Sequence, residues 1–134
     1  MPYIRVWIHY VWAVKKRQPI LSDPFRDKLF NHIRENAIVK DIYLDRVNGY
    51  VDHVHCLVSL GSDQTLEKVA QLIKGEASFW FNNKSGFNTD HLEWQDEYFA
   101  VSVSESMLDT VRVYIDNQVE HHQKKLFRKS MMSL

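Results

Sequence analysis

The sequence predicts an α+β fold built on a four-stranded antiparallel sheet, with two helices on one face and a further helix towards the C-terminus. Segments rich in β-branched and aromatic residues alternate with segments whose apolar residues recur at helical spacing. Their order is strand, helix, strand, strand, helix, strand, which is that of a ferredoxin-like or RRM-like split βαβ sheet. We therefore expect a single domain over residues 1–134, with one sheet face left for a ligand or for the last helix.

The composition favours a globular protein of the cytoplasm. The chain is 45% hydrophobic and 25% charged, and no apolar run approaches the ~20 residues that cross a bilayer. The first residues lack the charged start and apolar middle of a signal peptide. The lone cysteine, Cys56, cannot form an internal disulfide, which fits a reducing compartment.

The net charge argues against a protein that binds duplex DNA through overall electrostatics, because 17 basic residues balance 17 acidic ones. Nucleic-acid contacts would have to come from local basic patches. Two such patches occur, although each is also typical of ordinary solvated surface; they are Lys15, Lys16 and Arg17, and Lys124, Lys125, Arg128 and Lys129.

The first half of the chain contains a strand, a helix and a hairpin. Residues 3–14 are β-branched and aromatic and predict a strand with little exposure. Ser22-Asp23-Pro24 is typical of a helix start, and we expect a helix over 24–36. Asn48-Gly49 separates two strand-like runs, 39–47 and 51–60, and predicts a tight antiparallel hairpin.

The second half predicts a helix, a strand and a helix. Apolar residues at helical spacing, after Thr65 as a cap, predict a helix over 65–82. A fourth strand is expected near 97–104. Ser106 and Asp109 have the spacing of a capping box, which predicts a last helix over 107–127. Its buried stripe would be Leu108, Val111, Ile115, Val119, His122 and Leu126.

The strand 51–60 contains the first candidate site. Side chains alternate along a strand, so Val54, Cys56 and Val58 form an apolar face while His53 and His55 share the other. The two histidines are then roughly 6.5–7 Å apart at strand rise, close enough to bind one ion. A pair of solvent-facing or cross-strand-paired histidines is the alternative.

The last helix contains the second candidate site. Tyr114 and Gln118 lie four apart and therefore on one side of the helix, with His121 and His122 near that face. If this helix crosses the open sheet face, two imidazoles and one amide oxygen could form a three-ligand site suited to Mg²⁺ or Mn²⁺. The ion would polarise a phosphodiester that Tyr114 attacks. A half-buried tyrosine and a surface glutamine are the alternatives for these two positions taken singly.

The two sites together resemble a known family. Residues 51–58, Val-Asp-His-Val-His-Cys-Leu-Val, resemble the histidine-hydrophobic-histidine (HUH) motif with its preceding aspartate. Residues 113–122, Val-Tyr-Ile-Asp-Asn-Gln-Val-Glu-His-His, resemble the tyrosine helix of the small single-tyrosine transposases of the insertion sequence 200/605 family. Residues 11–17, 72–75 and 94–100 are also similar to that family, so the resemblance spans essentially the whole chain.

The resemblance implies a DNA transposase that cuts and rejoins single-stranded DNA at insertion-sequence ends through a covalent 5′-phosphotyrosine. It implies His53, His55 and Gln118 as ligands of a divalent metal and Tyr114 as the nucleophile. It also implies recognition of DNA hairpins near the element ends. Finally, it implies a homodimer in which the tyrosine helix of one subunit commonly completes the site of the other.

The residues fit this chemistry. A phosphotyrosine retains the energy of the phosphodiester, and the sequence has no phosphate-binding glycine loop for ATP. Single-stranded DNA is bound by modest basic patches with aromatic residues that stack on bases. Our candidates for phosphate contacts are Lys15, Lys16, Arg17 and Lys74. Trp94 is a candidate for base stacking, with a core aromatic as the alternative.

Three other functions are consistent with parts of this pattern. A non-enzymatic single-stranded nucleic-acid-binding module could have the same sheet, although stacking aromatics rather than histidines would be expected on its face. A replication initiator or relaxase shares the chemistry but is usually larger than 134 residues. A domesticated relative that processes repeats in its host genome has the same sequence features as a mobile enzyme.

Overall fold

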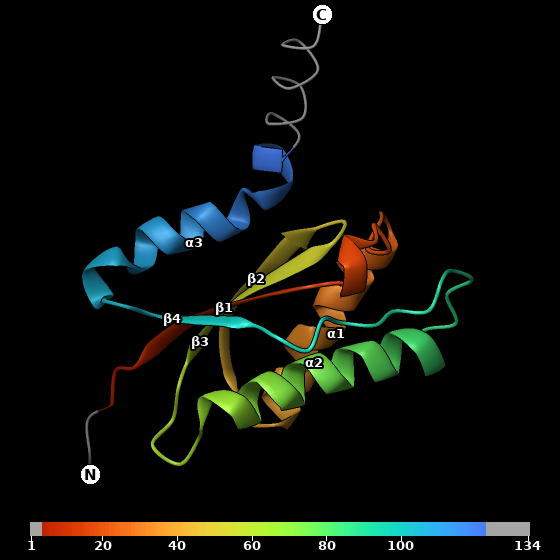
Figure 1. Cartoon of the computed structure of the whole chain (residues 1–134). Coiled ribbons are helices and arrows are strands. Elements are labelled where there is room, and N and C mark those ends of the chain that lie inside the picture. Colours follow the sequence, from red (N-terminus) through yellow and green to blue (C-terminus); the bar gives the residue numbers. More distant parts are fainter. Residues whose placement is uncertain (1–3, 123–134) are drawn as a thin grey trace, which may run out of the picture.

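The computed structural model describes residues 4–122 and confirms the predicted α+β sheet (Figure 1). The strands pair in the order β2-β3-β1-β4, and every neighbouring pair is antiparallel. In chain order the elements are β1 (Trp7–Ala13), η1 (Lys15–Arg17), α1 (Phe25–Val39), β2 (Tyr43–Tyr50), β3 (His53–Ser59), α2 (Leu66–Asn83), β4 (Phe99–Val103), η2 (Glu105–Met107) and α3 (Leu108–Asp116).

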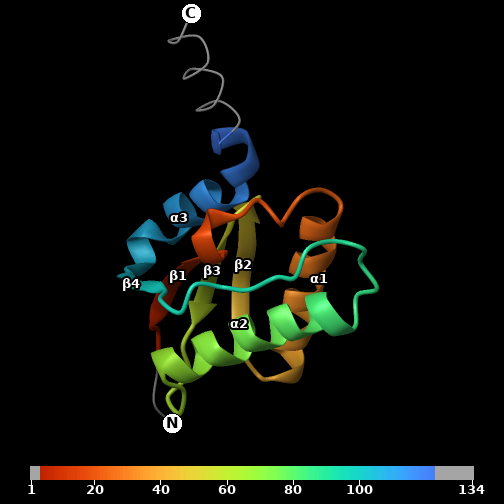
Figure 2. The same cartoon turned by 45° about the vertical axis from the view of Figure 1, so that its right-hand side comes forward.

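The sheet separates two apolar layers of unequal size. Helices α1 and α2 cover one face, and α3 crosses the other (Figures 1 and 2). The larger cluster, between the sheet and α1 and α2, includes Tyr10, Val54 and Cys56. The smaller cluster, on the α3 face, consists of Trp7, Leu57, Leu108 and Ile115. The alternation predicted for residues 51–60 is therefore confirmed, because Val54 and Leu57 lie on opposite faces.

The predicted hairpin forms, but its turn is three residues further along the chain. Asn48 and Gly49 lie within β2, opposite His55 and Val54, and the turn consists of Val51 and Asp52. A Cβ at position 49 would collide with the carbonyl oxygen of His53. Gly49 is therefore required for the close approach of two strands and not for a turn, which is why the prediction from the Asn-Gly pair was wrong.

The predicted helices form with altered ends. Helix α1 begins one residue later than expected and continues to Val39. Thr65 caps α2 as predicted, because its side chain accepts a hydrogen bond from the Lys68 amide at 3.1 Å. None of the helices in the described part of the chain is long and apolar enough to cross a membrane.

The last predicted helix is interrupted. Helix α3 ends at Asp116, Asn117 is a turn, and a second helical segment continues from 118 to 122. The remainder of the predicted helix, with Leu126, lies outside the described residues, as does the second basic patch. The predicted capping box is also wrong, because Ser106 lies in η2 and no side chain caps α3. Gln118 directly follows the interruption, and its side chain is buried against His53 of the sheet.

The close approach at Gly49 generates a prediction about stability. We expect Gly49→Ala to lower the free energy of unfolding by about 1–3 kcal/mol, because the added methyl group must displace the β3 backbone. The matched control is Gly75→Ala in α2, where an added Cβ meets nothing within 4 Å. That substitution should raise stability by about 0.5–1 kcal/mol through helix propensity. Urea denaturation measures both, and equal effects of the two substitutions would contradict the steric argument.

Candidate active site

The two strand histidines lie between the sheet and α3, and they are not on the protein surface. His53 and His55 are each 5% exposed, and their ring centroids are 5.1 Å apart. They share the α3 face of β3 with Leu57, as the alternation predicted. The burial of both rings excludes the solvent-facing alternative for the pair.

A chain of hydrogen bonds orients His53. Its Nδ1 lies 2.8 Å from Asp52 Oδ1, and Asp52 Oδ2 accepts a hydrogen bond from Arg17 Nε at 2.9 Å. Burial raises the pKa of Asp52, but the hydrogen bonds from His53 and Arg17 outweigh it and hold the pKa below its ordinary value. The ionised carboxylate keeps the proton of a neutral His53 on Nδ1, which leaves the lone pair of Nε2 directed away from Asp52.

The backbone is strained at Lys16 and Arg17, where this series of hydrogen bonds begins. Lys16 and Arg17 have left-handed conformations, with φ of 58° and 53°. Such conformations cost of order 1–3 kcal/mol each in residues other than glycine. Since Arg17 in this conformation reaches Asp52, the ion pair is one of the contacts that offset the strain.

The second histidine has a histidine partner. His55 Nδ1 lies 2.9 Å from His9 Nε2 on β1, and the two rings are stacked. Burial lowers the pKa of His55 to about 3, with further lowering by His53, His9 and His122, while a hydrogen bond to Gln118 opposes the shift. Burial also lowers the pKa of His9. Both rings are therefore neutral at pH 7 and retain a lone pair.

The helix residues complete the cluster. Gln118 is fully buried, and its Oε1 lies 3.3 Å from His53 Nε2 and 3.2 Å from His122 Nε2. Its amide nitrogen donates a hydrogen bond to the Tyr114 carbonyl at 3.1 Å. The Tyr114 side chain is half-exposed, and its ring centroid is 5.6 Å from that of His55. One chain therefore brings together His53, His55, Tyr114 and Gln118, the four residues singled out from the sequence.

Polar contacts with β2 hold α3 in this position. Asn48 Nδ2 donates hydrogen bonds to the Ile115 and Asp116 carbonyls at 2.9 and 3.1 Å, and so satisfies carbonyl groups left unpaired at the helix end. Arg112 binds Asp45 through Nε and Nη2, at 2.7 and 3.3 Å. These contacts from β2 fix the end of α3 where the chain turns into Gln118.

The donor set fits a divalent cation. With the His53 proton on Nδ1, His53 Nε2 and Gln118 Oε1 are two acceptors that face each other at 3.3 Å. A cation between them would satisfy both lone pairs. Residues 4–122 contain no cluster of three or more His, Cys, Asp or Glu side chains arranged to bind a metal. A metal site here would therefore depend on the amide oxygen of Gln118.

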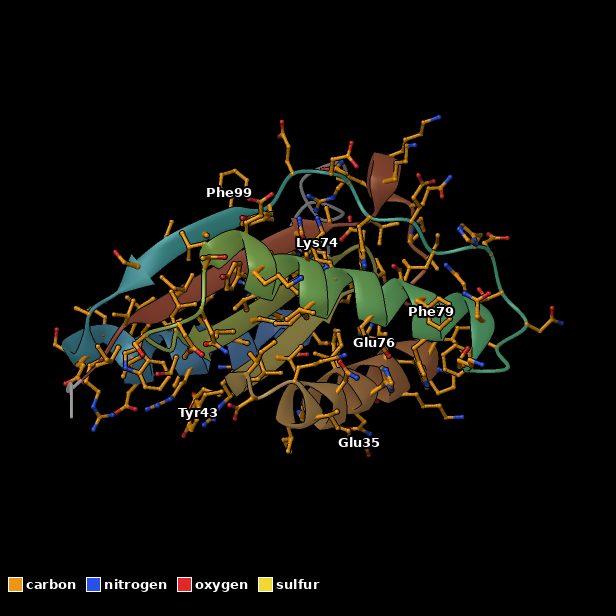
Figure 3. All side chains as sticks on the ribbon, turned by 90° about the horizontal axis from the view of Figure 1, so that it is seen from below. Glu35, Tyr43, Lys74, Glu76, Phe79 and Phe99 are labelled. Carbon is orange, nitrogen blue, oxygen red and sulfur yellow. The ribbon has the colours of Figure 1, made fainter. Side chains whose placement is uncertain are left out.

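A cleft of about 580 Å³ opens beside the cluster. Its walls come from β1, the turn after β1, the segment that enters β4, and α3. Phe99, at the start of β4, is 73% exposed and projects from the outer edge of the sheet (Figure 3). The residues that line the cleft are Val11, Trp12, Ala13, Arg17, His53, His55, Gln95, Asp96, Glu97, Tyr98, Phe99, Tyr114 and His122.

The predicted phosphate-binding residues have different surroundings. Lys15 forms an exposed ion pair with Glu93 at 3.2 Å, and Lys16 is exposed. Arg17 lines the cleft while its Nε binds Asp52. Lys74 is a residue of α2, and its side chain reaches the segment that leads into β4 (Figure 3). There Nζ donates hydrogen bonds to the Gln95 and Asp96 carbonyls at 2.9 and 3.2 Å. Lys74 thus stabilises that segment.

Trp94, the predicted stacking residue, lies in the core. It is 8% exposed, its ring packs edge-on against Trp12, and its Nε1 donates a hydrogen bond to the Lys74 carbonyl at 2.8 Å. This placement favours the core alternative. Two residues of the site, His9 and Phe99, were not predicted from the sequence. Both follow from the alternation of their strands once β1 and β4 are known to be neighbours.

In this fold, a helix tyrosine faces two strand histidines. That combination defines the class of single-tyrosine HUH nucleases. Comparison with known families identifies the chain more closely, because residues 3–118 match the family described as "Transposase IS200 like" (Y1_Tnp). The chain belongs to the IS200-like transposase family.

Individual relatives agree with this assignment. Over 123 residues the chain is 24% identical to the ISDra2 transposase TnpA of Deinococcus radiodurans, covering 82% of this chain and 81% of that protein. A crystal structure of a transposase from the same organism has a TM-score of 0.69 at 23% identity, covering 88% of this chain and 95% of that one. A REP-associated tyrosine transposase bound to a REP hairpin has a TM-score of 0.62 at 17% identity, covering 90% and 72%. These two structural similarities establish the fold.

The contact between β2 and α3 generates a second prediction. Asn48→Ala removes the donor for the Ile115 and Asp116 carbonyls, so we expect α3 to open more readily, by about 1–2 kcal/mol. Hydrogen exchange of the α3 amides measures this opening. The matched control is Asn83→Ala at the end of α2, where the side chain also donates to a helix carbonyl. Unchanged α3 exchange in Asn48→Ala would contradict the anchoring role.

Proposed function

We propose that this transposase cleaves and rejoins single-stranded DNA at the ends of an insertion sequence, by metal-assisted attack of Tyr114 through a covalent 5′-phosphotyrosine. The observation that carries the proposal is the packing of Tyr114 and Gln118 against His53 and His55 within one chain. A helix that only stabilises the fold would not be expected to bury a glutamine amide against a histidine nitrogen.

Three side chains would hold the ion, namely His53, His55 and Gln118. Two imidazole nitrogens and one amide oxygen suit Mg²⁺ or Mn²⁺, and leave coordination positions for the phosphate and water. When bound, such an ion supplies Lewis-acid stabilisation of the charge that develops on the phosphate oxygens. Asp52 maintains the His53 tautomer that this requires.

The covalent step belongs to Tyr114. Its hydroxyl oxygen attacks the phosphorus, a bond between that oxygen and phosphorus forms, and the bond from phosphorus to the 3′ oxygen of the preceding nucleotide breaks. The tyrosine proton passes to solvent, and the departing 3′ oxygen takes up a proton. Attack by another 3′ hydroxyl reverses the step, so that rejoining consumes no ATP. The half-exposed position of Tyr114 at the cleft leaves its ring accessible to a DNA strand.

The cleft suits a single strand. Arg17 lines it, and Lys15 and Lys16 line an adjoining hollow of about 450 Å³, so phosphates could be bound on either side of the η1 turn. Phe99 is exposed at the rim and offers a ring on which a base can stack, worth about 1–3 kcal/mol. A relative of the same fold is bound to a REP hairpin. We propose that a hairpin near the element end is the recognised feature here too.

We also propose a homodimer. Strand β4 lies at the edge of the sheet, and exposed edges of this kind commonly pair with another chain. Phe99 and Val101 on β4, with Met107 and Val113 around α3, are exposed apolar side chains in the same part of the molecule. Because one chain already brings the four site residues together, exchange of α3 between subunits would reproduce these contacts with the helix of the partner.

Repeat processing by a domesticated relative is the second candidate, favoured by the likeness to a REP-associated transposase. The two functions differ in their DNA and not in their chemistry. Oligonucleotides from the flanking DNA of the gene and from dispersed repeat hairpins would distinguish them. A non-enzymatic binding module is disfavoured, because α3 covers the sheet face that would stack on bases.

The nucleophile can be tested directly. Wild-type protein with Mg²⁺ and labelled single-stranded oligonucleotides should form an adduct that resists denaturation, and Tyr114→Phe should form none because it lacks the attacking oxygen. Tyr43→Phe is the matched control, since Tyr43 is also an exposed tyrosine but lies at the start of β2. An adduct with Tyr114→Phe would show that another residue attacks.

The proposed metal site predicts a loss of cleavage activity when any one of its ligands is removed. We expect His53→Ala, His55→Ala and Gln118→Ala each to reduce cleavage by about 100-fold or more, since loss of even an outer partner costs 10–100-fold. EDTA should abolish cleavage by the wild-type protein. His32→Ala is the control, because His32 is a partly buried histidine that pairs with Glu76 on the helical face. Cleavage that survives His53→Ala combined with His55→Ala would remove the metal from the mechanism.

A further inference from the structure

His9 is a partly buried polar residue of the site for which the proposed mechanism has no role. It lies on β1, opposite Leu57 of β3 and Val101 of β4. Its Nε2 is 2.9 Å from His55 Nδ1, and the two rings stack with centroids 5.1 Å apart. His55 pairs with Val11 in the register, so His9 and His55 are diagonal neighbours on the α3 face.

The direction of this hydrogen bond decides what His55 can bind. If His55 Nδ1–H donates to His9, the lone pair of His55 lies on Nε2, the nitrogen available to the cleft. If His9 Nε2–H donates instead, a neutral His55 has its proton on Nε2. Gln118 Oε1 could accept that proton, and His55 could not bind an ion there.

We propose that His9 is a positioning residue, which accepts the Nδ1 proton of His55 and so directs His55 Nε2 to the metal. The inference rests on the proposed metal site. It gives His55 the arrangement that His53 already has, in which an acceptor binds Nδ1 and leaves Nε2 for the ion; there the acceptor is Asp52. Metal-binding histidines commonly require such a partner, which sets the tautomer and ring orientation.

The position of His9 suits this role. Strand β1 is central in the sheet and pairs with β3 on one side and β4 on the other, so the His9 backbone is held by two neighbours. Tyr114 contacts the same pair of rings, with centroid distances of 6.3 Å to His9 and 5.6 Å to His55. His9 thus fixes the ring that lies between the nucleophile and the ion site.

Metal affinity tests the inference without DNA or cleavage. Mn²⁺ binding to the full chain, followed by electron paramagnetic resonance, should weaken by about 10–100-fold in His9→Phe, which keeps a ring but lacks the acceptor. His9→Gln offers an amide oxygen near the position of Nε2 and should stay within about threefold of the wild-type value. His32→Phe is the matched control, because His32 also stacks on an aromatic ring and bonds through Nε2.

Nuclear magnetic resonance of the wild-type protein provides a test that needs no variant to fold. With histidine labelled with ¹⁵N and with saturating Mg²⁺, the shared proton should reside on His55 Nδ1, with a nitrogen–nitrogen coupling to His9 Nε2 across the hydrogen bond. A proton on His9 Nε2 would overturn the inference. Unchanged Mn²⁺ affinity in folded His9→Phe would overturn it too and leave the proposed function standing. Failure of the wild-type protein to bind Mn²⁺ would instead remove the metal site itself, and the role of His9 with it.

Discussion

The contact between the buried amide of Gln118 and the His53 ring is the interaction on which the rest of the site depends. It joins the sheet to the segment that follows the tyrosine helix, and it lies between two acceptor atoms when the His53 proton is on Nδ1, beside Asp52. Burying such a pair is unfavourable unless a donor or a cation satisfies it. The ion that we propose would lie between these two atoms and satisfy both.

Two local features make the contact possible. The turn at Val51 and Asp52 places the carboxylate directly before His53, within hydrogen-bond distance of its ring. The break at Asn117 ends α3 directly before the buried Gln118, while Asn48 satisfies the helix carbonyls that the break leaves open. A continuous helix could present Tyr114 and Gln118 on one side, but it would have no unpaired carbonyls for Asn48 to bind. The strand β2 therefore positions the helix of Tyr114, although none of the proposed ligands lies on it.

Where a prediction from the sequence was wrong, the residues of the local sequence signal form tertiary contacts instead. Asn48-Gly49 is a strong hairpin signal by itself, yet the asparagine anchors α3 and the glycine allows His53 to approach. Lys74 and Trp94 are residue types that commonly contact DNA, yet here they form contacts within the protein. Lys74 donates hydrogen bonds to the segment before β4, and Trp94 donates a hydrogen bond to the Lys74 carbonyl. The exposed fraction of a side chain distinguishes residues that can contact DNA from residues that stabilise the fold, and it is known only for the folded chain. Phe99 was not among the predicted DNA-binding residues, yet it is 73% exposed and lines the cleft.

The sequence by itself determined the order of the elements, the face on which His53 and His55 lie, and the side of the helix shared by Tyr114 and Gln118. These follow from periods of 2.0 and 3.6 residues, which are set by local backbone geometry and need no knowledge of neighbours. Only the tertiary structure decided that α3 lies over the histidines, that His9 contacts the Nδ1 atom of His55, and that the helix breaks before Gln118. Such contacts join residues far apart in the chain, 65 positions for His53 and Gln118, and depend on which strands become neighbours when the apolar faces are buried.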